Sequence, residues 1–166
     1  MRHMIALAAT AALAASAASA QTDSVTTELK NSAGQAMGSV TLTQGPKGVV
    51  MRVEAKGLTP GWHGLHFHEK ADCSKSDFTS AGGHTHGGGE RVHGLLNPEA
   101  NETGDLPNLY AGADGAGAAE VYTTLTSLKA LRDADGSAVV IHANADDHKT
   151  QPIGGAGARV ACAVIK

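Results

Sequence analysis

The chain has 166 residues and a net charge of −3, and it contains no run of basic residues. This charge balance gives no support for binding to nucleic acid or to an anionic membrane surface. Aromatic residues make up only 3% of the chain. A core of Val, Leu, Ile and Ala is therefore expected to bury little apolar surface and to need further stabilisation.

Residues 1–20 have the composition of a secretory signal peptide. Arg2 precedes an apolar, alanine-rich run over residues 4–15, and the small residues 18–20 are typical of a cleavage site. The run is too short for a membrane span, and no later apolar stretch approaches that length. We therefore expect residues 1–20 to be removed and residues 21–166 to form one exported domain with no membrane partner.

Short segments with alternating apolar and polar residues follow, and they predict β-strands. Gly, Pro, Asn or Asp separates them, and glycine occurs 21 times in the chain. Several short strands with turn residues between them are typical of an antiparallel sandwich or barrel. The predicted strands lie around residues 25–29, 38–43, 49–55, 64–68, 118–123, 138–142 and 159–165. Residues 125–131 form either a turn of helix or a loop.

Two long stretches, from residue 69 to about 106 and from 143 to 158, lack a regular pattern. Loops of this length in a compact domain are usually functional or need an external constraint. We therefore expect the chemistry of the protein to lie in these loops.

Five histidines occur in settings typical of metal ligands. His66 and His68 flank one apolar residue, and alternate side chains of a strand share a face, so both rings can reach one point. His84, His93 and His142 follow further along the chain. Imidazole suits copper, zinc, iron and nickel, so the five residues together predict a transition-metal site.

The chain has two cysteines, Cys73 and Cys162. In an exported protein such a distant pair favours a disulfide over two free thiols. A role as metal ligands is less favoured because the two residues do not form a short C-x-x-C motif. The bridge would close a loop of about 90 residues and stabilise the fold by roughly 4–5 kcal/mol in the chain-entropy model.

These segments, in this order, resemble the copper/zinc superoxide dismutase family in its bacterial exported form. The match extends over nearly all of residues 21–166. Its pieces are Gly61–His68, Ser80–His84, Gly104–Pro107, Val140–Asp147, Gly154–Arg159 and Ala161–Ile165. The resemblance implies an eight-stranded Greek-key β-sandwich or barrel with long metal-binding and electrostatic loops. It also implies a periplasmic location, one copper and one zinc per subunit, and allows a homodimer.

The same resemblance implies a role for each site residue. The copper ligands would be His66, His68, His84 and His142, and the zinc ligands would be His84, His93 and Asp105. His84 would bridge the two metals as an imidazolate and take part in catalysis. Arg159 would hold the anionic substrate beside copper. Asp146 would accept hydrogen bonds from His66 and His93 and orient both rings. Cys73 and Cys162 would form the disulfide of the family.

One position departs from the family pattern. Much of the family has a third zinc histidine three residues before the zinc aspartate, where this chain has Glu102. Glutamate can bind zinc through oxygen, so we expect either ligation by Glu102 or weak zinc binding. His86 is a lesser alternative, because it would have to loop back around the bridging residue. We expect a structural role for His63 and a place in a solvated loop for His148.

The resemblance implies superoxide dismutase activity, in which two superoxide anions and two protons become dioxygen and hydrogen peroxide through redox cycling of copper. The alternative is a non-catalytic exported copper/zinc-binding protein that buffers or delivers copper. Relatives without catalysis usually lack a copper ligand or the arginine at the copper channel. This chain has both, which favours the enzyme.

Overall fold

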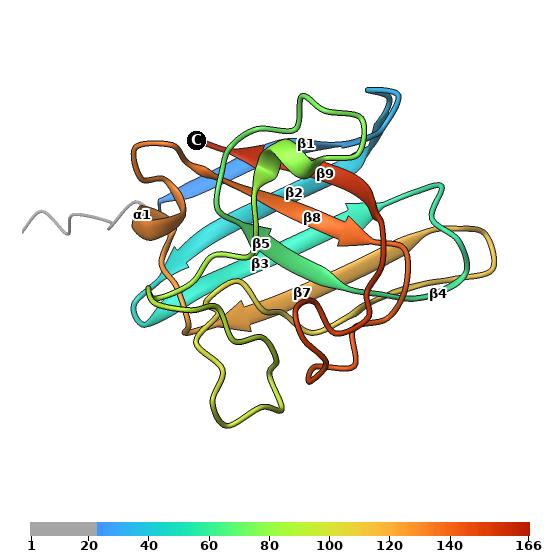
Figure 1. Cartoon of the computed structure of the whole chain (residues 1–166). Coiled ribbons are helices and arrows are strands. Elements are labelled where there is room, and N and C mark those ends of the chain that lie inside the picture. The colour runs from blue at the N-terminus through green and yellow to red at the C-terminus, as the bar shows by residue number, and fades with distance from the viewer. Residues whose placement is uncertain (1–22) are drawn as a thin grey trace, which may run out of the picture.

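Nine strands of one antiparallel sheet account for most of the regular structure in residues 23–166, the part of the chain that the computed structural model describes (Figure 1). The strands are β1 (Ser24–Asn31), β2 (Ala36–Gly45), β3 (Gly48–Ala55), β4 (Gly61–His63), β5 (Leu65–His68), β6 (Leu109–Ala111), β7 (Gly117–Thr123), β8 (Ser137–His142) and β9 (Arg159–Ile165). The predicted signal peptide lies outside the described residues.

The order of strands in the sheet is β4-β6-β7-β3-β2-β1-β9-β8-β5. Only Gly64 separates β4 from β5, which stand at opposite ends of this order, so the sheet nearly closes on itself. Counted as one strand that changes partner at Gly64, β4 and β5 bring the number to the eight expected. The pairing of β1 with β9 and of β3 with β7 requires long crossing connections of the Greek-key type. The predicted all-β sandwich or barrel is confirmed.

Each of the seven predicted strand segments is a strand in the structure. The sequence did not indicate β4 or β6, because each has only three residues, too few to show a period. The segment over residues 125–131 contains one short helix, α1 (Leu128–Leu131), and the side chain of Ser127 caps it by accepting from the amide of Ala130. The two patternless stretches lack strands, and the first contains a 3₁₀ turn, η1 (Thr79–Ala81).

The core lies inside the barrel, and β3 shows why its sequence forms a strand. Val49, Met51 and Val53 are buried at every second position, whereas the intervening Arg52 and Glu54 are exposed. Such alternation buries one face of a strand and leaves the other in water. Aliphatic side chains dominate this core, as the composition indicates.

All six residues of β8 are buried, because its outer face is covered as well. Phe78 and Ala81, from the loop over residues 69–108, pack there against Ala138 and Val140 in a second apolar cluster. The predicted disulfide between Cys73 and Cys162 is present and ties this loop to β9. The outer faces of β5 and β8 therefore lie beneath a loop that a covalent bond anchors.

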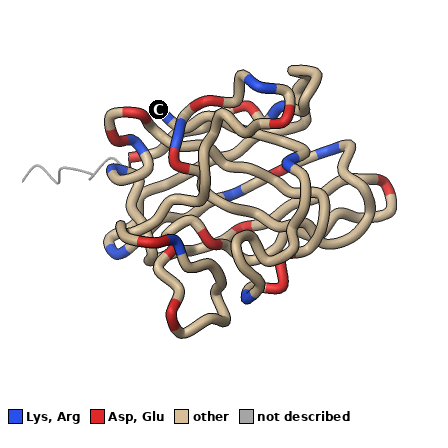
Figure 2. The backbone as a smooth tube through the Cα atoms, in the orientation of Figure 1, with Lys and Arg blue, Asp and Glu red and all other residues tan. Residues whose placement is uncertain are grey.

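Charged side chains of both signs are distributed over the chain (Figure 2). Within residues 23–166 no helix has the length and apolar character needed to cross a membrane.

Candidate metal centre

The alternation of β5 sends two histidines to its outer face. Leu65 and Phe67 point into the barrel core, so His66 and His68 point the other way, toward the covering loop. His66 lies opposite Val140 of β8, whose side chain belongs to the outer cluster. His142, two residues further along β8, shares that face.

The free edge of β5 positions ligands from the loop over residues 69–108. An edge strand has unpaired backbone N–H and C=O groups. Here those groups form hydrogen bonds with short segments of that loop. The amide of Phe67 donates to the carbonyl of Gly104 at 2.9 Å, and the Phe67 carbonyl accepts from the amide of Thr85 at 2.9 Å. Isolated β-bridges place His84 beside His68 and Asp105 beside His66.

The four predicted copper ligands converge. One nitrogen from each of His66, His68, His84 and His142 lies within 4.8 Å of the others, and all four side chains are buried. Each of these four rings has one buried nitrogen without a hydrogen-bond partner: His66 Nδ1, His68 Nε2, His84 Nε2 and His142 Nε2. Buried polar atoms without partners are costly, and four imidazole nitrogens around one point fit a copper ion.

The second nitrogen of each strand histidine is held by hydrogen bonding. Nε2 of His66 bonds to Oδ2 of Asp146 at 2.7 Å. Nδ1 of His68 bonds to the carbonyl of Gly82 at 3.0 Å, and Nδ1 of His142 bonds to that of Gly157 at 3.1 Å. These contacts fix the tautomer and leave the other nitrogen free for a metal. Burial lowers the pKa of His66 to about 3 and that of His142 to about 4, which keeps both neutral.

The predicted zinc ligands form a second group that shares His84 with the first. Nδ1 of His84 and Nδ1 of His93 lie 3.2 Å and 2.9 Å from Oδ1 of Asp105. His66 also lies close to this group, but its Nε2 is bonded to Asp146. Two imidazoles and a carboxylate are ligands that zinc accepts. His84 thus turns its two nitrogens toward two different groups.

Electrostatics differ between the two groups. Burial alone would lower the pKa of His84 and of His93, but hydrogen bonds to Asp105 and Glu102, and for His93 also to Asp146, outweigh it. The pKa of His84 is raised, and that of His93 is raised to about 11. The second group therefore attracts positive charge even without a metal.

Asp146 lies where the resemblance implies, behind both groups. Besides His66, it contacts Nε2 of His93 at 3.1 Å through Oδ1.

Two amide side chains that the sequence did not single out support this arrangement. Asn108 bonds both the amide and the carbonyl of Asp146, at 2.9 Å and 2.8 Å. Gln151 holds the amide and the carbonyl of His93, each at 2.8 Å. No motif marks these residues, because their partners are backbone groups far along the chain.

Arg159 lines a surface pocket together with His84. Its guanidinium donates to the carbonyl of Phe78 at 2.5 Å and to that of Gly82 at 2.6 Å. The second carbonyl is also the partner of His68 Nδ1. The arginine is half-buried and rigidly held, so it places a fixed positive charge beside the four-imidazole group.

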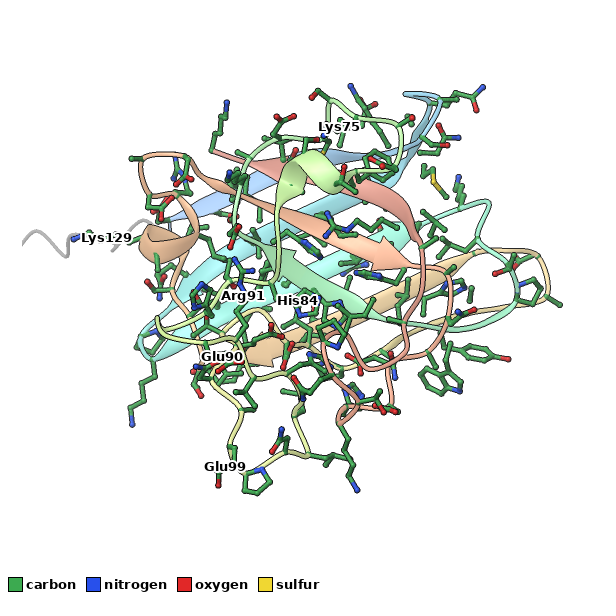
Figure 3. All side chains as sticks on the ribbon, viewed as in Figure 1. Lys75, His84, Glu90, Arg91, Glu99 and Lys129 are labelled. Atoms are coloured by element: carbon green, nitrogen blue, oxygen red, sulfur yellow. A yellow bond between two sulfur atoms is a disulfide. The ribbon has the colours of Figure 1, made fainter. Side chains whose placement is uncertain are left out.

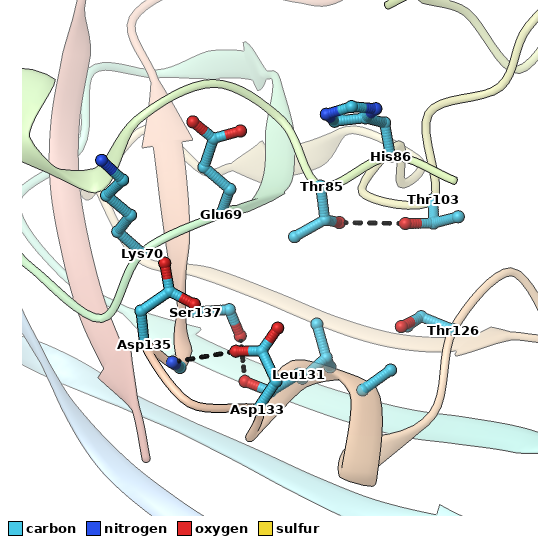
Figure 4. A pocket seen from close by; sticks show the side chains of 12 residues that line it. Glu69, Lys70, Thr85, His86, Thr103, Thr126, Leu131, Asp133, Asp135 and Ser137 are labelled. Carbon is cyan, nitrogen blue, oxygen red and sulfur yellow. Dashed lines mark hydrogen bonds between the residues drawn. The ribbon is translucent and has the colours of Figure 1, made fainter. Parts of the chain in front are cut away.

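Within residues 23–166, His63, His86 and His148 stay outside both groups. The ring nitrogens of His63 lie 2.7 Å and 2.8 Å from the carbonyls of His142 and Thr59, which agrees with a structural role. His86 lines both the pocket that contains Arg159 and a second pocket beside the hydrogen-bonded hydroxyls of Thr85 and Thr103 (Figure 4).

The expectation of a solvated loop residue fails for His148. The residue is half-buried, with a φ of 61°, and its amide donates to Oδ1 of Asp146 at 2.6 Å. It therefore helps to hold the carboxylate behind the two groups. A sequence cannot indicate this role, because the backbone amide carries it.

Comparisons with known proteins agree with this geometry. Residues 36–165 match the family model described as copper/zinc superoxide dismutase (SODC). A superoxide dismutase [Cu-Zn] of Caulobacter vibrioides is 62% identical over 149 residues, covering 86% of each chain.

Solved structures give the same result. A Cu/Zn superoxide dismutase from Brucella abortus matches with a TM-score of 0.73 and 32% identity, over 87% of this chain and 100% of the other. A double mutant of a SOD-like protein from Bacillus subtilis matches with a TM-score of 0.80 and 39% identity, over 84% and 95%. The fold, the two groups of converging ligands and these matches together establish that the chain belongs to the copper/zinc superoxide dismutase family.

Proposed function

We propose that this protein is a superoxide dismutase, which converts two superoxide anions and two protons into dioxygen and hydrogen peroxide. The observation that carries the proposal is the set of four buried imidazole nitrogens without partners that converge beneath a fixed arginine. Membership of the family supports the same conclusion.

The proposed copper ligands are Nδ1 of His66 and the Nε2 atoms of His68, His84 and His142. Copper bound there would supply one-electron redox chemistry, taking an electron from one superoxide and giving it to the next. The proposed zinc ligands include Nδ1 of His84, Nδ1 of His93 and Oδ1 of Asp105. Zinc would hold His84 in place and tune the basicity of the His84 imidazole. The oxidation state of zinc itself would not change.

Two residues of the chain would act on the substrate directly. Arg159 would attract the small anion to the pocket and orient it, since a fixed charge in a concave site raises encounter rates. Once Nε2 of His84 no longer holds copper after the first half-reaction, that atom would take up a proton and deliver it to the second anion. The peroxide leaves after it takes up a second proton from water.

The location of the protein is also part of the proposal. We propose that residues 1–20 are a signal peptide and that residues 21–166 act in the periplasm. The disulfide between Cys73 and Cys162 supports an oxidising compartment. We propose superoxide as the substrate, and neither nucleic acid nor membrane as a partner.

The test is a superoxide assay on the mature protein loaded with copper and zinc, beside the His142→Ala variant. We expect copper-dependent dismutation in the wild type and its loss in the variant, because the variant keeps only three of the four imidazoles. Zinc content should be unchanged, which controls for folding. A copper-loaded wild type no faster than free copper would instead indicate a copper buffer.

A further inference from the structure

Glu102 occupies the position where the family pattern has a zinc histidine, and its carboxylate lies inside the second group. Oε2 is 2.6 Å from Nδ1 of His84 and 2.9 Å from Nδ1 of His93. The residue is only 6% exposed. A buried carboxylate oxygen thus contacts the two imidazole nitrogens that already face Asp105.

Four of the six distances among the candidate ligand atoms are close to those of a zinc ligand set. The distances between neighbouring atoms of Glu102, Asp105, His84 and His93 run from 2.6 to 3.2 Å. Four ligands placed tetrahedrally around zinc at 2.0–2.1 Å would lie about 3.3 Å apart. A slight expansion of the group would therefore accommodate the ion.

Local backbone contacts hold both carboxylates in place. Glu102 forms an isolated β-bridge with His86, and the amide of Thr103 donates to the carbonyl of Thr85 at 2.8 Å. The amide of Gly94 donates to Oδ2 of Asp105 at 2.7 Å. That bond leaves Oδ1 of Asp105 directed at the imidazoles.

Two other histidines near the group form hydrogen bonds with other partners. Nδ1 of His86 accepts from the amide of Gly88 at 3.1 Å. Nε2 of His66 is bonded to Asp146. Among residues 23–166, Glu102 is thus the side chain best placed to join His84, His93 and Asp105.

We propose that Oε2 of Glu102 is the fourth ligand of the second metal, which then has two imidazole and two carboxylate ligands. This inference deepens the proposed function and rests on the second site binding zinc. The additional carboxylate makes the net charge of the loaded centre one unit more negative than a third imidazole would. Copper binding by the four-imidazole group does not require Glu102.

The experiment measures zinc affinity by competition with a chelator, on mature protein without copper. Glu102→Gln keeps the shape of the side chain but removes its charge. We expect zinc to bind at least about 100-fold more weakly, because loss of an outer contact alone costs about 10–100-fold. The matched control is Glu99→Gln, an exposed residue of the same loop that lies far from His84 (Figure 3) and should bind zinc like the wild type.

A second readout separates ligation from a structural role. Cobalt(II) in the zinc site absorbs visible light according to its coordination geometry. We expect the cobalt spectrum to change in Glu102→Gln, and Glu102→His to restore a four-coordinate spectrum and tight zinc binding. An unchanged zinc affinity and cobalt spectrum in Glu102→Gln would overturn the inference.

The outcome is distinguishable from failure of the proposed function. Glu102→Gln should still bind one copper through the four imidazoles, with a native circular dichroism spectrum. A wild type that binds zinc through Glu102 but does not dismute superoxide would refute the function and leave the inference standing. A wild type that dismutes superoxide but binds no zinc would refute the inference alone.

Discussion

Asp146 determines which nitrogen of His66 faces the four-imidazole group. Its Oδ2 bonds to Nε2 of His66 at 2.7 Å, so Nδ1 of His66 remains buried without a partner. Burial alone would raise the pKa of Asp146, but hydrogen bonds from His66 and His93 hold it well below its usual range. An ionised carboxylate with two imidazole N–H donors therefore links the two groups.

The first prediction concerns Asp146→Asn. An amide offers one acceptor oxygen, so one of the two imidazole N–H groups would face an NH₂ group. We expect affinity for copper or zinc to fall by about 10–100-fold, as for other outer contacts of metal ligands. Metal titration checks this result. Asp147→Asn, at the exposed neighbouring residue, is the control, and an equal loss in both variants would contradict the role of Asp146.

Gly154 provides a second test of the same carboxylate. A Cβ at Gly154 would collide with Oδ1 of Asp146, whereas a Cβ at Gly155 meets no atom within 4 Å. Both glycines have a positive φ, 60° and 69°, so alanine is strained at either position. We expect Gly154→Ala to lose much more metal than Gly155→Ala. Similar metal contents in the two variants would mean that backbone strain, not the contact with Asp146, sets the effect.

Arg159→Ala should slow turnover while copper stays bound. Loss of the fixed cation should lower kcat/KM by about tenfold or more and flatten its dependence on ionic strength. Arg159→Lys should keep much of the salt dependence, although it cannot make both bonds to Phe78 and Gly82. Rates at several salt concentrations, with copper content measured in parallel, check the prediction. An unchanged rate in the alanine variant would remove Arg159 from the mechanism.

Zinc binding should release protons and tighten as pH rises. With a pKa of about 11 in the metal-free protein, His93 is protonated at pH 7, and zinc needs its deprotonated Nδ1. Affinity should therefore rise about tenfold per pH unit for each proton released, and level off above that pKa. Calorimetry in two buffers of different ionisation enthalpy measures the release. Zinc uptake without proton release would contradict the pKa of His93.

The disulfide should contribute strongly to stability. Its partners are 89 residues apart, and closure of such a loop is worth about 4–5 kcal/mol in the chain-entropy model. We expect the Cys73→Ala, Cys162→Ala double variant to lose about that much free energy of unfolding in urea. A loss of less than about 1 kcal/mol would show that noncovalent contacts, such as those of Arg159 with Phe78, suffice to hold the loop.

Strand positions could be predicted because they depend on local alternation. The pair His66 and His68 is the clearest case, since the period of a strand puts both rings on one face whatever surrounds them. The three residues of β6 could not be predicted, because their pairing with β4 and β7 is a tertiary property. The roles of Asn108 and Gln151 are equally hidden, since each depends on a backbone group at least 38 residues away.

The sequence by itself determined the strand pattern, the candidate metal-ligating side chains and the family that they resemble, because these depend on residue type and order. Only the tertiary structure decided which nitrogen of each imidazole faces which group and where Glu102 points. Those outcomes depend on hydrogen bonds between distant segments, such as that of Asp146 with His66, and the folded barrel brings these segments together.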